Sequence, residues 1–422
     1  MDKIIVQGGI PLHGTVTVSG AKNAALPLLF ASLLTQDECT LRRIPRLVDI
    51  QTALRLLKEL GVQADWLSTN EVALHARGVQ QIEAPYDLVK TMRASFLVLG
   101  PLLARFGRAR VSTPGGCAIG TRPVNIHLSG LQQLGASIHI RQGYVEAEAS
   151  RLKGADITFD FPSVGATENL MMAATLATGT TVLNNVAREP EIEDLAAMLV
   201  AMGARIHGAG SRTIVIDGVQ GLHGVTHTVI PDRVEAGTFL IAGAITSGNV
   251  LVRGARADHL KSFLQALQQA GVQVHEETEG IRVLGNGRPA GVQITTQPYP
   301  GFPTDLQAQM MALLALGQQQ SVLTEMIFEN RFMHAQELVR LGADIYVHGH
   351  TATIKGVAFL SGAPVMATDL RASVSLILAG LAARGETEIA RIYHLDRGYE
   401  QIEAKLSQLG ARIQRQKSTS PQ

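Results

Sequence analysis

Hydrophobic and polar positions follow a pattern that recurs six times along the chain. Each recurrence is an amphipathic stretch that ends in a short phrase such as "LKELGV" or "LVRLGA", followed by a β-like run such as "ASIHI". The phrase glycines are spaced 68 to 74 residues apart, and they are Gly61, Gly135, Gly203, Gly271, Gly342 and Gly410. Each phrase therefore predicts an amphipathic helix with glycine at a left-handed C-terminal cap, leading into a strand.

A second, more apolar helix is expected between these phrases, again six times. Small residues dominate these stretches, so each helix should be largely buried with closely packed backbones, over 21–34, 89–107, 164–179, 234–248, 306–317 and 370–385. A turn and a strand follow most of them, as in "GTTVLNN". The predicted unit is strand, helix, strand, helix, strand, of about 70 residues, which is long enough to build a small core of its own. Two unrelated α/β domains with chance similarity are the alternative, and the regular spacing argues against them.

Composition narrows the class of protein. The 422 residues are 46% hydrophobic and 4% aromatic with a formal charge of +1, so no broad field attracts nucleic acid or an anionic membrane. "MDKIIVQGGI" lacks the apolar core of an export signal and alternates like a strand. "LPLLFASLL" is far shorter than the roughly 20 residues of a membrane span. Two cysteines make no disulfide framework, and we expect a reduced, soluble, cytoplasmic protein.

Polar residues open several of the buried helices. Ser163, Asp232, Asp305 and Asp369 stand where a side-chain oxygen can cap free backbone N–H groups, and for Asp232 the cap is the preferred interpretation. Cations stand near turns, mostly at helix starts, where they oppose the helix dipole: Lys22, Arg93, Arg122, Arg331, Arg371 and Arg397. This placement favours an anionic ligand, since guanidinium groups bind phosphate and carboxylate in bidentate fashion.

Cys117 lies in the glycine turn "STPGGCAIGTRP", five residues before Arg122. A nearby cation stabilises a thiolate, so this cysteine is a candidate for chemistry, whereas Cys39 at the start of a strand is assigned to packing. The 13 histidines are scattered, and CxxC, HExxH and P-loop motifs are absent. We expect no metal site and no cofactor.

Motifs in every repeat resemble one family closely. These are "SGAKNAALP", "PGGCAIGTRP", "FPSVGAT", "EPEIEDL", "PDRVEAGTFL", "FPTDLQAQ", "ENRFMH", "ATDLRAS" and "HLDRGYE". Together they resemble the UDP-N-acetylglucosamine 1-carboxyvinyltransferases (MurA) of the enolpyruvyl transferase family. The chain is similar, more distantly, to the 5-enolpyruvylshikimate-3-phosphate (EPSP) synthases, which lack the cysteine loop.

The resemblance implies a two-domain inside-out α/β barrel, the EPSP synthase-like fold, with strands outside and buried helices inside. It implies one domain over 22–230 and a second over 1–21 plus 231–422, with "KIIVQGG" completing the sheet of the sixth unit. A deep cleft between them would receive UDP-N-acetylglucosamine and then phosphoenolpyruvate. The implied reaction transfers the enolpyruvyl group to the sugar 3′-hydroxyl and releases phosphate, the first committed step of peptidoglycan synthesis.

Residue roles follow from the same resemblance. Cys117 would be the general acid and the target of fosfomycin, and Asp305 the general base. Lys22, Arg122 and Arg397 would hold the phosphate and carboxylate of phosphoenolpyruvate. Asn23, Arg93, Arg331, Asp369 and Arg371 match positions that line the cleft. The nucleotide sugar would contact Arg93, Arg122, Pro123, Val124, Asn125, Ile126, Phe161, Pro162, Ser163, Val164, Asp305 and Ile327.

Two positions depart from the family's common pattern. Asn125 stands where an aspartate is frequent, and Phe161 replaces a lysine of some members, so individual uridine contacts should differ. The glycines around Cys117 suggest a lid that closes over the substrates. Competing interpretations are the shikimate-pathway transferase, a catalytically silent repeat scaffold and a ring that binds nucleic acid. The sequence does not reveal the oligomeric state, and we expect a monomer.

Overall fold

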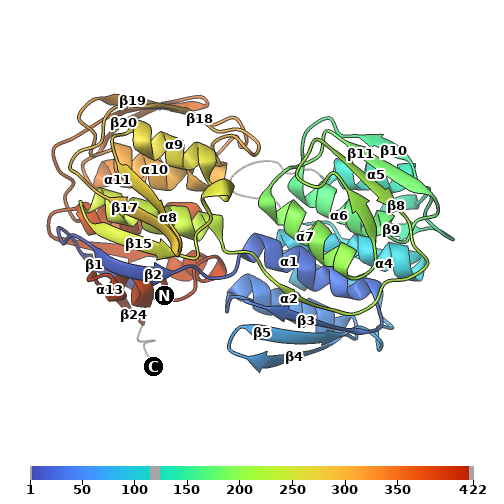
Figure 1. The fold of residues 1–422 in the computed structure, drawn as a ribbon. Helices are drawn as coiled ribbons and strands as arrows, with labels where there is room; N and C mark the ends of the chain where they lie inside the picture. The colour runs from blue at the N-terminus through green and yellow to red at the C-terminus, as the bar shows by residue number, and fades with distance from the viewer. Residues whose placement is uncertain (1, 115–123, 418–422) are drawn as a thin grey trace. The chain divides into compact units, whose positions relative to one another are not determined.

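The computed structural model describes residues 2–114 and 124–417 and divides them into two compact units (Figure 1). The first unit consists of residues 2–19 and 231–417, and the second of residues 20–114 and 124–230. Six four-stranded sheets are present in the described residues, three in each unit.

All six sheets share one strand pattern. An edge strand runs parallel to its neighbour, and the next two strands are antiparallel. The first five repeats thus read strand, buried helix, strand, amphipathic helix, and then a hairpin of two strands. In the sixth repeat a single described strand follows the amphipathic helix, and the N-terminal strand Lys3–Gln7 takes the place of the second. The sequence predicted only one strand after the amphipathic helix. The second strand of the hairpin, such as Glu71–His75, lies in the sheet interior and was missed because its pattern is short and largely apolar.

The second unit contains the first three repeats. Its sheets are β14(Val225–Thr228)-β3(Glu38–Arg42)-β5(Glu71–His75)-β4(Gln63–Ser68), β6(Glu83–Ala84)-β7(Arg108–Ser112)-β9(Tyr144–Glu148)-β8(Ser137–Arg141) and β10(Asp156–Thr158)-β11(Thr180–Asn184)-β13(Thr213–Asp217)-β12(Arg205–His207). Its helices are α1(Lys22–Ala31), η1(Ser32–Leu34), α2(Val48–Glu59), α3(Tyr86–Val89), η2(Arg93–Val98), α4(Leu99–Phe106), α5(Asn125–Gln133), α6(Val164–Ala174) and α7(Pro190–Ala201).

The first unit contains the last three repeats. Its sheets are β16(Gln273–Glu277)-β17(Gly280–Leu284)-β15(Asn249–Arg253)-β2(His13–Thr17), β18(Gln293–Thr295)-β19(Gln320–Thr324)-β21(Thr351–Lys355)-β20(Asp344–His348) and β22(Pro364–Met366)-β23(Glu386–Ala390)-β1(Lys3–Gln7)-β24(Arg412–Gln416). Its helices are α8(Arg233–Ile245), η3(Ala257–His259), α9(Lys261–Gln269), η4(Thr304–Leu306), α10(Gln307–Leu314), α11(His334–Arg340), α12(Leu370–Ala382), η5(Ile392–Arg397) and α13(Ile402–Gln408).

Strands from the N-terminal segment complete two sheets of the first unit. β1 pairs with β23 on one side and β24 on the other, which confirms the prediction that "KIIVQGG" completes the sixth sheet. β2 pairs in parallel with β15. In the second unit, β14 is the corresponding edge strand and pairs in parallel with β3.

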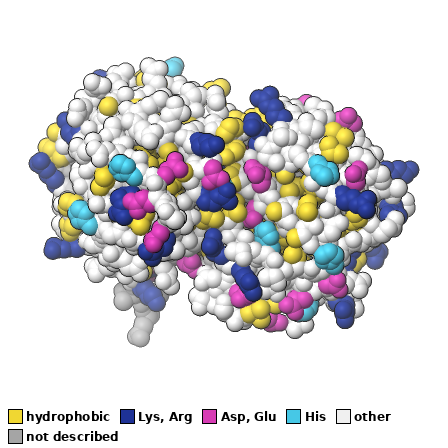
Figure 2. Space-filling model, in the orientation of Figure 1, with side chains coloured by type: hydrophobic (Ala, Val, Ile, Leu, Met, Phe, Trp, Pro, Cys, Tyr) yellow, Lys and Arg dark blue, Asp and Glu magenta, His cyan; other side chains and the backbone are white. Residues whose placement is uncertain are grey.

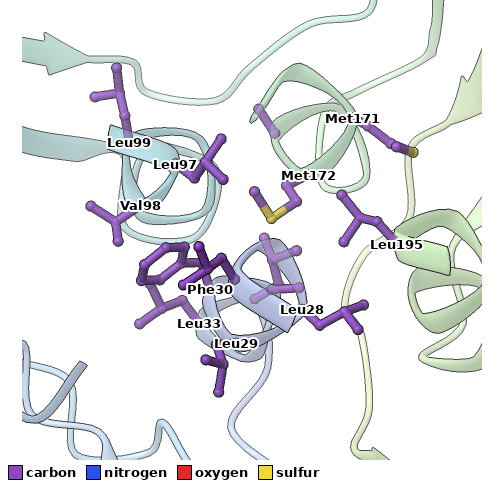
Figure 3. Close-up of a cluster of buried hydrophobic side chains, with 14 of the residues drawn as sticks. Leu28, Leu29, Phe30, Leu33, Leu97, Val98, Leu99, Met171, Met172 and Leu195 are labelled. Atoms are coloured by element: carbon purple, nitrogen blue, oxygen red, sulfur yellow. The ribbon is translucent and has the colours of Figure 1, made fainter. Parts of the chain in front are cut away.

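The apolar helices form the centre of each unit. In α8 every residue from Val234 to Ile245 is buried, and in α10 every residue is buried. Figure 3 shows this packing in the second unit, where apolar side chains of several helices meet; the labelled ones are Leu28, Leu29, Phe30, Leu33, Leu97, Val98, Leu99, Met171, Met172 and Leu195. Helices buried on all sides with sheets around them are the inside-out arrangement that the family resemblance implies.

The six phrase glycines end the amphipathic helices as predicted. Their φ angles lie between 83° and 103°, the left-handed region that glycine adopts without steric cost. On the face shown in Figure 2, basic and acidic side chains are interspersed, consistent with the balanced charge of the chain.

Candidate functional site

Asp305 lies at the centre of a charged cluster in the first unit. It belongs to η4, which leads into the buried helix α10. Its Oδ1 accepts a hydrogen bond of 2.7 Å from Nη2 of Arg331, and its Oδ2 one of 2.8 Å from Nη2 of Arg371. The two arginine side chains are only 5% and 9% exposed, against 29% for Asp305. One partly open carboxylate is therefore shared by two buried cations.

The cluster stabilises the charged form of Arg371. Burial alone would lower the pKa of Arg371, but the charges of Asp305 and Tyr399 and the hydrogen bond to Asp305 outweigh it, so the pKa is raised above its usual value. The two guanidinium groups in turn favour the ionised carboxylate of Asp305. An ionised carboxylate with solvent access can accept a proton, as a general base must.

A helix cap is the alternative role that the sequence allows for Asp305, but other residues occupy the cap positions of the helices that follow. The N-cap positions of η4 and α10 are Pro303 and Leu306, and neither makes a side-chain cap bond. The carboxylate is turned toward the two arginines, because charge-assisted bonds to guanidinium are stronger than a bond to a neutral backbone N–H.

The other predicted caps are confirmed. Asp232 Oδ1 accepts bonds from the backbone of α8 at 2.8 and 3.0 Å. Asp369 Oδ1 accepts from Arg371 N at 2.8 Å at the start of α12, and Ser163 Oγ accepts from Ala166 N at 3.3 Å at the start of α6.

His334 and Arg397 are two further titratable residues of this unit. His334 is buried at the start of α11, and burial, with Arg331 adding to it, lowers its pKa to about 4 despite the charge of Asp369. It is therefore neutral at pH 7. Arg397 is half-buried and ends η5, so this cation lies at the end of a 3-10 helix and not at a helix start.

Lys22 has an acidic partner in the second unit. It is the first residue of α1, and its Nζ lies 3.0 Å from Oδ2 of Asp49 in the first turn of α2. The side chains are 13% and 5% exposed, so this pair is largely buried. Asp49 explains how a cation is held at a helix start, whereas the neighbouring Asn23 is exposed. Sequence analysis missed Asp49, although an acid on the apolar face of α2 is a signal for a buried partner.

Three predicted site segments of the second unit meet at one buried histidine. Arg93 opens η2, Asn125 and Ile126 open α5, and Ser163 precedes α6. His127 of α5 lies between them, edge to face with Phe96 of η2 at 5.3 Å and bonded to Asn169 of α6.

The hydrogen bonds fix the tautomer of this histidine. Asn169 Oδ1 accepts from Gly100 N at 2.7 Å, so its Nδ2 donates to His127 Nδ1 at 3.0 Å and the ring proton lies on Nε2. Burial, followed by the charge of Arg93, lowers the pKa of His127 to about 3. His127 and Asn169 were missed in the sequence because a single histidine and a single asparagine in apolar helices carry no motif.

The remaining predicted contacts are distributed as follows. Phe161 is 46% exposed just before α6, with Pro162 and Val164 half-buried beside it. Ile327 follows β19, and its backbone N–H donates to the Glu325 carboxylate at 2.8 Å. Val124 is the N-cap residue of α5. Cys117, Arg122 and Pro123 lie outside the described residues.

Cys39 is buried in β3, as the packing assignment predicts, and burial raises the pKa of its thiol to about 11. In residues 2–114 and 124–417, His, Cys, Asp and Glu form no group of three that could hold a metal ion. Within the same residues, no helix is both long and apolar enough to cross a membrane.

Comparisons with known proteins show the family to which the chain belongs. Residues 6–406 match the family model described as EPSP synthase (3-phosphoshikimate 1-carboxyvinyltransferase). The chain is 59% identical over 415 residues to a UDP-N-acetylglucosamine 1-carboxyvinyltransferase of Geotalea uraniireducens, covering 98% of this chain and 99% of that one. It is 57% identical over 420 residues to the Myxococcus xanthus protein of the same name, covering 99% and 100%.

Solved structures share the fold. The enolpyruvyl transferase NikO from Streptomyces tendae superposes with a TM-score of 0.88 at 25% identity, covering 99% of both chains. An EPSP synthase from Acinetobacter baumannii superposes with a TM-score of 0.79 at 19% identity, covering 99% of this chain and 100% of that one.

Proposed function

The chain belongs to the EPSP synthase family of enolpyruvyl transferases, and from this we propose that it acts on UDP-N-acetylglucosamine. It transfers the enolpyruvyl group of phosphoenolpyruvate to the 3′-hydroxyl of this nucleotide sugar and releases phosphate. This is the first committed step of peptidoglycan synthesis. The observation that carries the assignment is 57% to 59% identity over nearly the whole chain to relatives named for this activity.

The reaction has two stages whose protons need acids and bases. In the addition, the 3′ oxygen loses its proton and bonds to C2 of phosphoenolpyruvate, while C3 gains a proton. In the elimination, C3 loses a proton and the bond between C2 and the phosphate oxygen breaks. Each stage needs a group that moves a proton at the oxygen or at C3.

Asp305 is proposed as the base that takes the hydroxyl proton. Its ionised state and partial exposure support this role. Arg331 and Arg371 orient its carboxylate, and Asp369 fixes the start of the helix that carries Arg371. Cys117 is proposed as the acid that protonates C3.

Cations are proposed to hold phosphoenolpyruvate, namely Lys22, Arg122 and Arg397. Cations held beside the substrate would stabilise charge on the tetrahedral intermediate. Arg93, Asn23, Ile327 and the segments around Asn125 and Ser163 are proposed to contact the nucleotide sugar. We further propose domains over 22–230 and over 1–21 plus 231–422, a monomer, and a cytoplasmic location, where both phosphorylated substrates are made.

Phosphate release is the test. Purified protein is mixed with phosphoenolpyruvate and UDP-N-acetylglucosamine without added metal, and release that depends on the nucleotide sugar is expected. Release only when shikimate 3-phosphate replaces the sugar would assign the chain to the shikimate branch. Silence with both acceptors would refute the transferase assignment.

The acid is tested separately with fosfomycin. Mass spectrometry should find one adduct, on Cys117, and none on the buried Cys39, which is the control within the same chain. Cys117→Ser should lose both the adduct and phosphate release. An undiminished adduct on the variant would show that another residue is the nucleophile.

A further inference from the structure

Glu325 is a buried carboxylate that the proposed catalytic roles leave unused. It follows β19 directly and is 1% exposed. Its Oε1 accepts bonds from Thr296 Oγ1 at 2.8 Å, Ile327 N at 2.8 Å and Phe328 N at 3.3 Å. Its Oε2 accepts from Thr304 Oγ1 at 2.9 Å. Four donors from three chain segments therefore converge on one side chain.

One oxygen is bonded to the segment that carries Asp305. Thr304 and Asp305 are consecutive residues of η4. The hydrogen bond from Thr304 thus fixes the turn from which the Asp305 carboxylate projects. Because general-base catalysis depends on the position of the base to within a fraction of an ångström, a shift of this turn would act on the proton transfer.

The other oxygen holds the loop 326–328, which contains the proposed nucleotide-sugar contact Ile327. Thr296 lies beside Glu325 because β18 and β19 run in parallel and end at the same edge. Its hydroxyl donates to Glu325 and accepts from Met326 N at 2.9 Å. All three backbone N–H groups of the loop are therefore bonded to Glu325 or to its partner Thr296.

The same loop also contacts a partner of Asp305. The ring of Phe328 lies 5.4 Å from the guanidinium carbon of Arg331. Arg331 donates to Asp305 Oδ1. Glu325 consequently supports Asp305 both through Thr304 and through the loop.

We infer that Glu325 is a positioning residue that sets the place of Asp305 and of the loop 326–328 relative to one another. The inference rests on the proposed function, in which Asp305 is the base and Ile327 contacts the nucleotide sugar. Only a carboxylate offers two acceptor oxygens and no donor. Glutamine at this position would direct its NH₂ group, a donor, at either the Thr304 hydroxyl or the loop 326–328, where an acceptor is needed.

The hydrogen bonds that Glu325 accepts from Thr304 and from Thr296 can be removed separately. Thr304→Val deletes the bond to Oε2 and should lower kcat roughly tenfold, with KM for UDP-N-acetylglucosamine changed less than about twofold, since a lost buried hydrogen bond costs about one factor of ten. Thr296→Val deletes the bond from Met326 N and the bond to Glu325 Oε1, and should raise that KM roughly tenfold with a smaller change in kcat. Glu325→Gln should change both constants. Thr304→Ser and Thr296→Ser keep the hydroxyl, so each should have kcat and KM close to the wild-type values.

Thr324→Val is the matched control. It removes a half-buried threonine hydroxyl at the end of β19 that pairs with Thr351 and not with Glu325, so both constants should stay at their wild-type values. The inference is overturned if the Thr304 and Thr296 variants behave like this control, or if each changes kcat and KM in the same proportion. Failure of the wild-type protein to release phosphate would instead overturn the proposed function.

Discussion

At the scale of single residues, Asp305 decides both charge balance and chemistry in the first unit. Asp305→Asn keeps the shape of the side chain but leaves the largely buried guanidinium groups of Arg331 and Arg371 without their shared anion. We expect a loss of about 3 kcal/mol in the free energy of unfolding, as for one broken buried ion pair. Phosphate release should fall by about 10²- to 10⁴-fold, the usual worth of a general base.

A matched variant separates the two effects. Arg331→Met removes one cation and leaves the carboxylate bonded to Arg371, so it should cost stability while retaining more turnover than Asp305→Asn. Urea unfolding and phosphate release are measured on both variants. If Asp305→Asn retained wild-type turnover, Asp305 would not be the base.

His127 makes the second unit sensitive to acid. Its pKa is lowered from 6.5 to about 3 in the folded state, by burial first and then by Arg93, so the unfolded chain binds the extra proton between these pH values. Stability due to neutral His127 is therefore present above about pH 6.5 and lost as pH falls. Between pH 7 and pH 5 the loss should be about 2 kcal/mol for this one group.

The comparison with His127→Gln isolates this contribution. The variant has no titrating ring, so its urea midpoint should fall less between pH 7 and pH 5 than the wild-type midpoint. His334, with its pKa lowered to about 4 by burial, titrates in the first unit and is the same in both proteins. Equal pH dependence of the two proteins would show that His127 is not held neutral by the fold.

At the scale of elements, the helix-ending glycines lend themselves to a clean test. Gly135 follows α5 with φ of 92°, and a Cβ added there would meet no atom within 4 Å. Gly135→Ala should therefore cost only the backbone strain of a left-handed alanine, about 1 kcal/mol of unfolding free energy. Gly135→Asn should cost less, because asparagine tolerates this conformation, and phosphate release should be unchanged for both.

Gly221 is the matched control in the same unit. A Cβ there also meets nothing within 4 Å, but its φ is outside the left-handed region. Gly221→Ala should leave the free energy of unfolding within about 0.5 kcal/mol of wild type, or raise it slightly. An equal loss for Gly135→Ala and Gly221→Ala would contradict the left-handed cap as the cause.

These glycines also show what the sequence could reveal about the elements. A left-handed cap is a local requirement that only a few residues meet, so a glycine at regular spacing predicted all six helix ends. The side chain of Asp305 has two local options, a cap or an ion pair. Its choice depends on Arg331 and Arg371, which are 26 and 66 residues away, and no local pattern reports them. The inner hairpin strands were missed for a related reason, since their partners on both sides determine their place.

The buried polar partners follow the same principle. Asp49, Asn169 and Glu325 each serve a group on another element, and each is a single polar residue in an apolar surrounding. The residues that the family resemblance supplied were those with a motif around them. Those found only in the structure are bonded to such a residue, as Asp49 is to Lys22, or to its neighbour in the chain, as Glu325 is to Thr304.

At the scale of the whole molecule, each unit completes a sheet with a strand that is distant in the sequence. β14, near the end of segment 124–230, pairs with β3 in one unit, and β2 of the N-terminal segment pairs with β15 in the other. The first unit also needs β1, whose Ile4 and Val6 are fully buried between β23 and β24. Sequence repeats predicted six similar units, and the alternation of the first residues predicted the strand β1. An interior strand needs a partner on each side, and β1 has β23 and β24.

The position of β1 between β23 and β24 predicts how the chain responds to truncation. Removing residues 1–7 deletes an interior strand and leaves β23 and β24 without their shared partner, so the first unit should lose its resistance to protease. The second unit contains residues 20–114 and 124–230 and none of the deleted ones, so it should remain folded. Limited proteolysis of the truncated chain, read by mass spectrometry, should leave residues 20–114 and 124–230 resistant, whereas in the full chain residues 2–19 and 231–417 should resist as well. Loss of resistance in both units at the same protease concentration would mean that they fold as one cooperative body, because damage confined to one sheet of the first unit would then have unfolded the second.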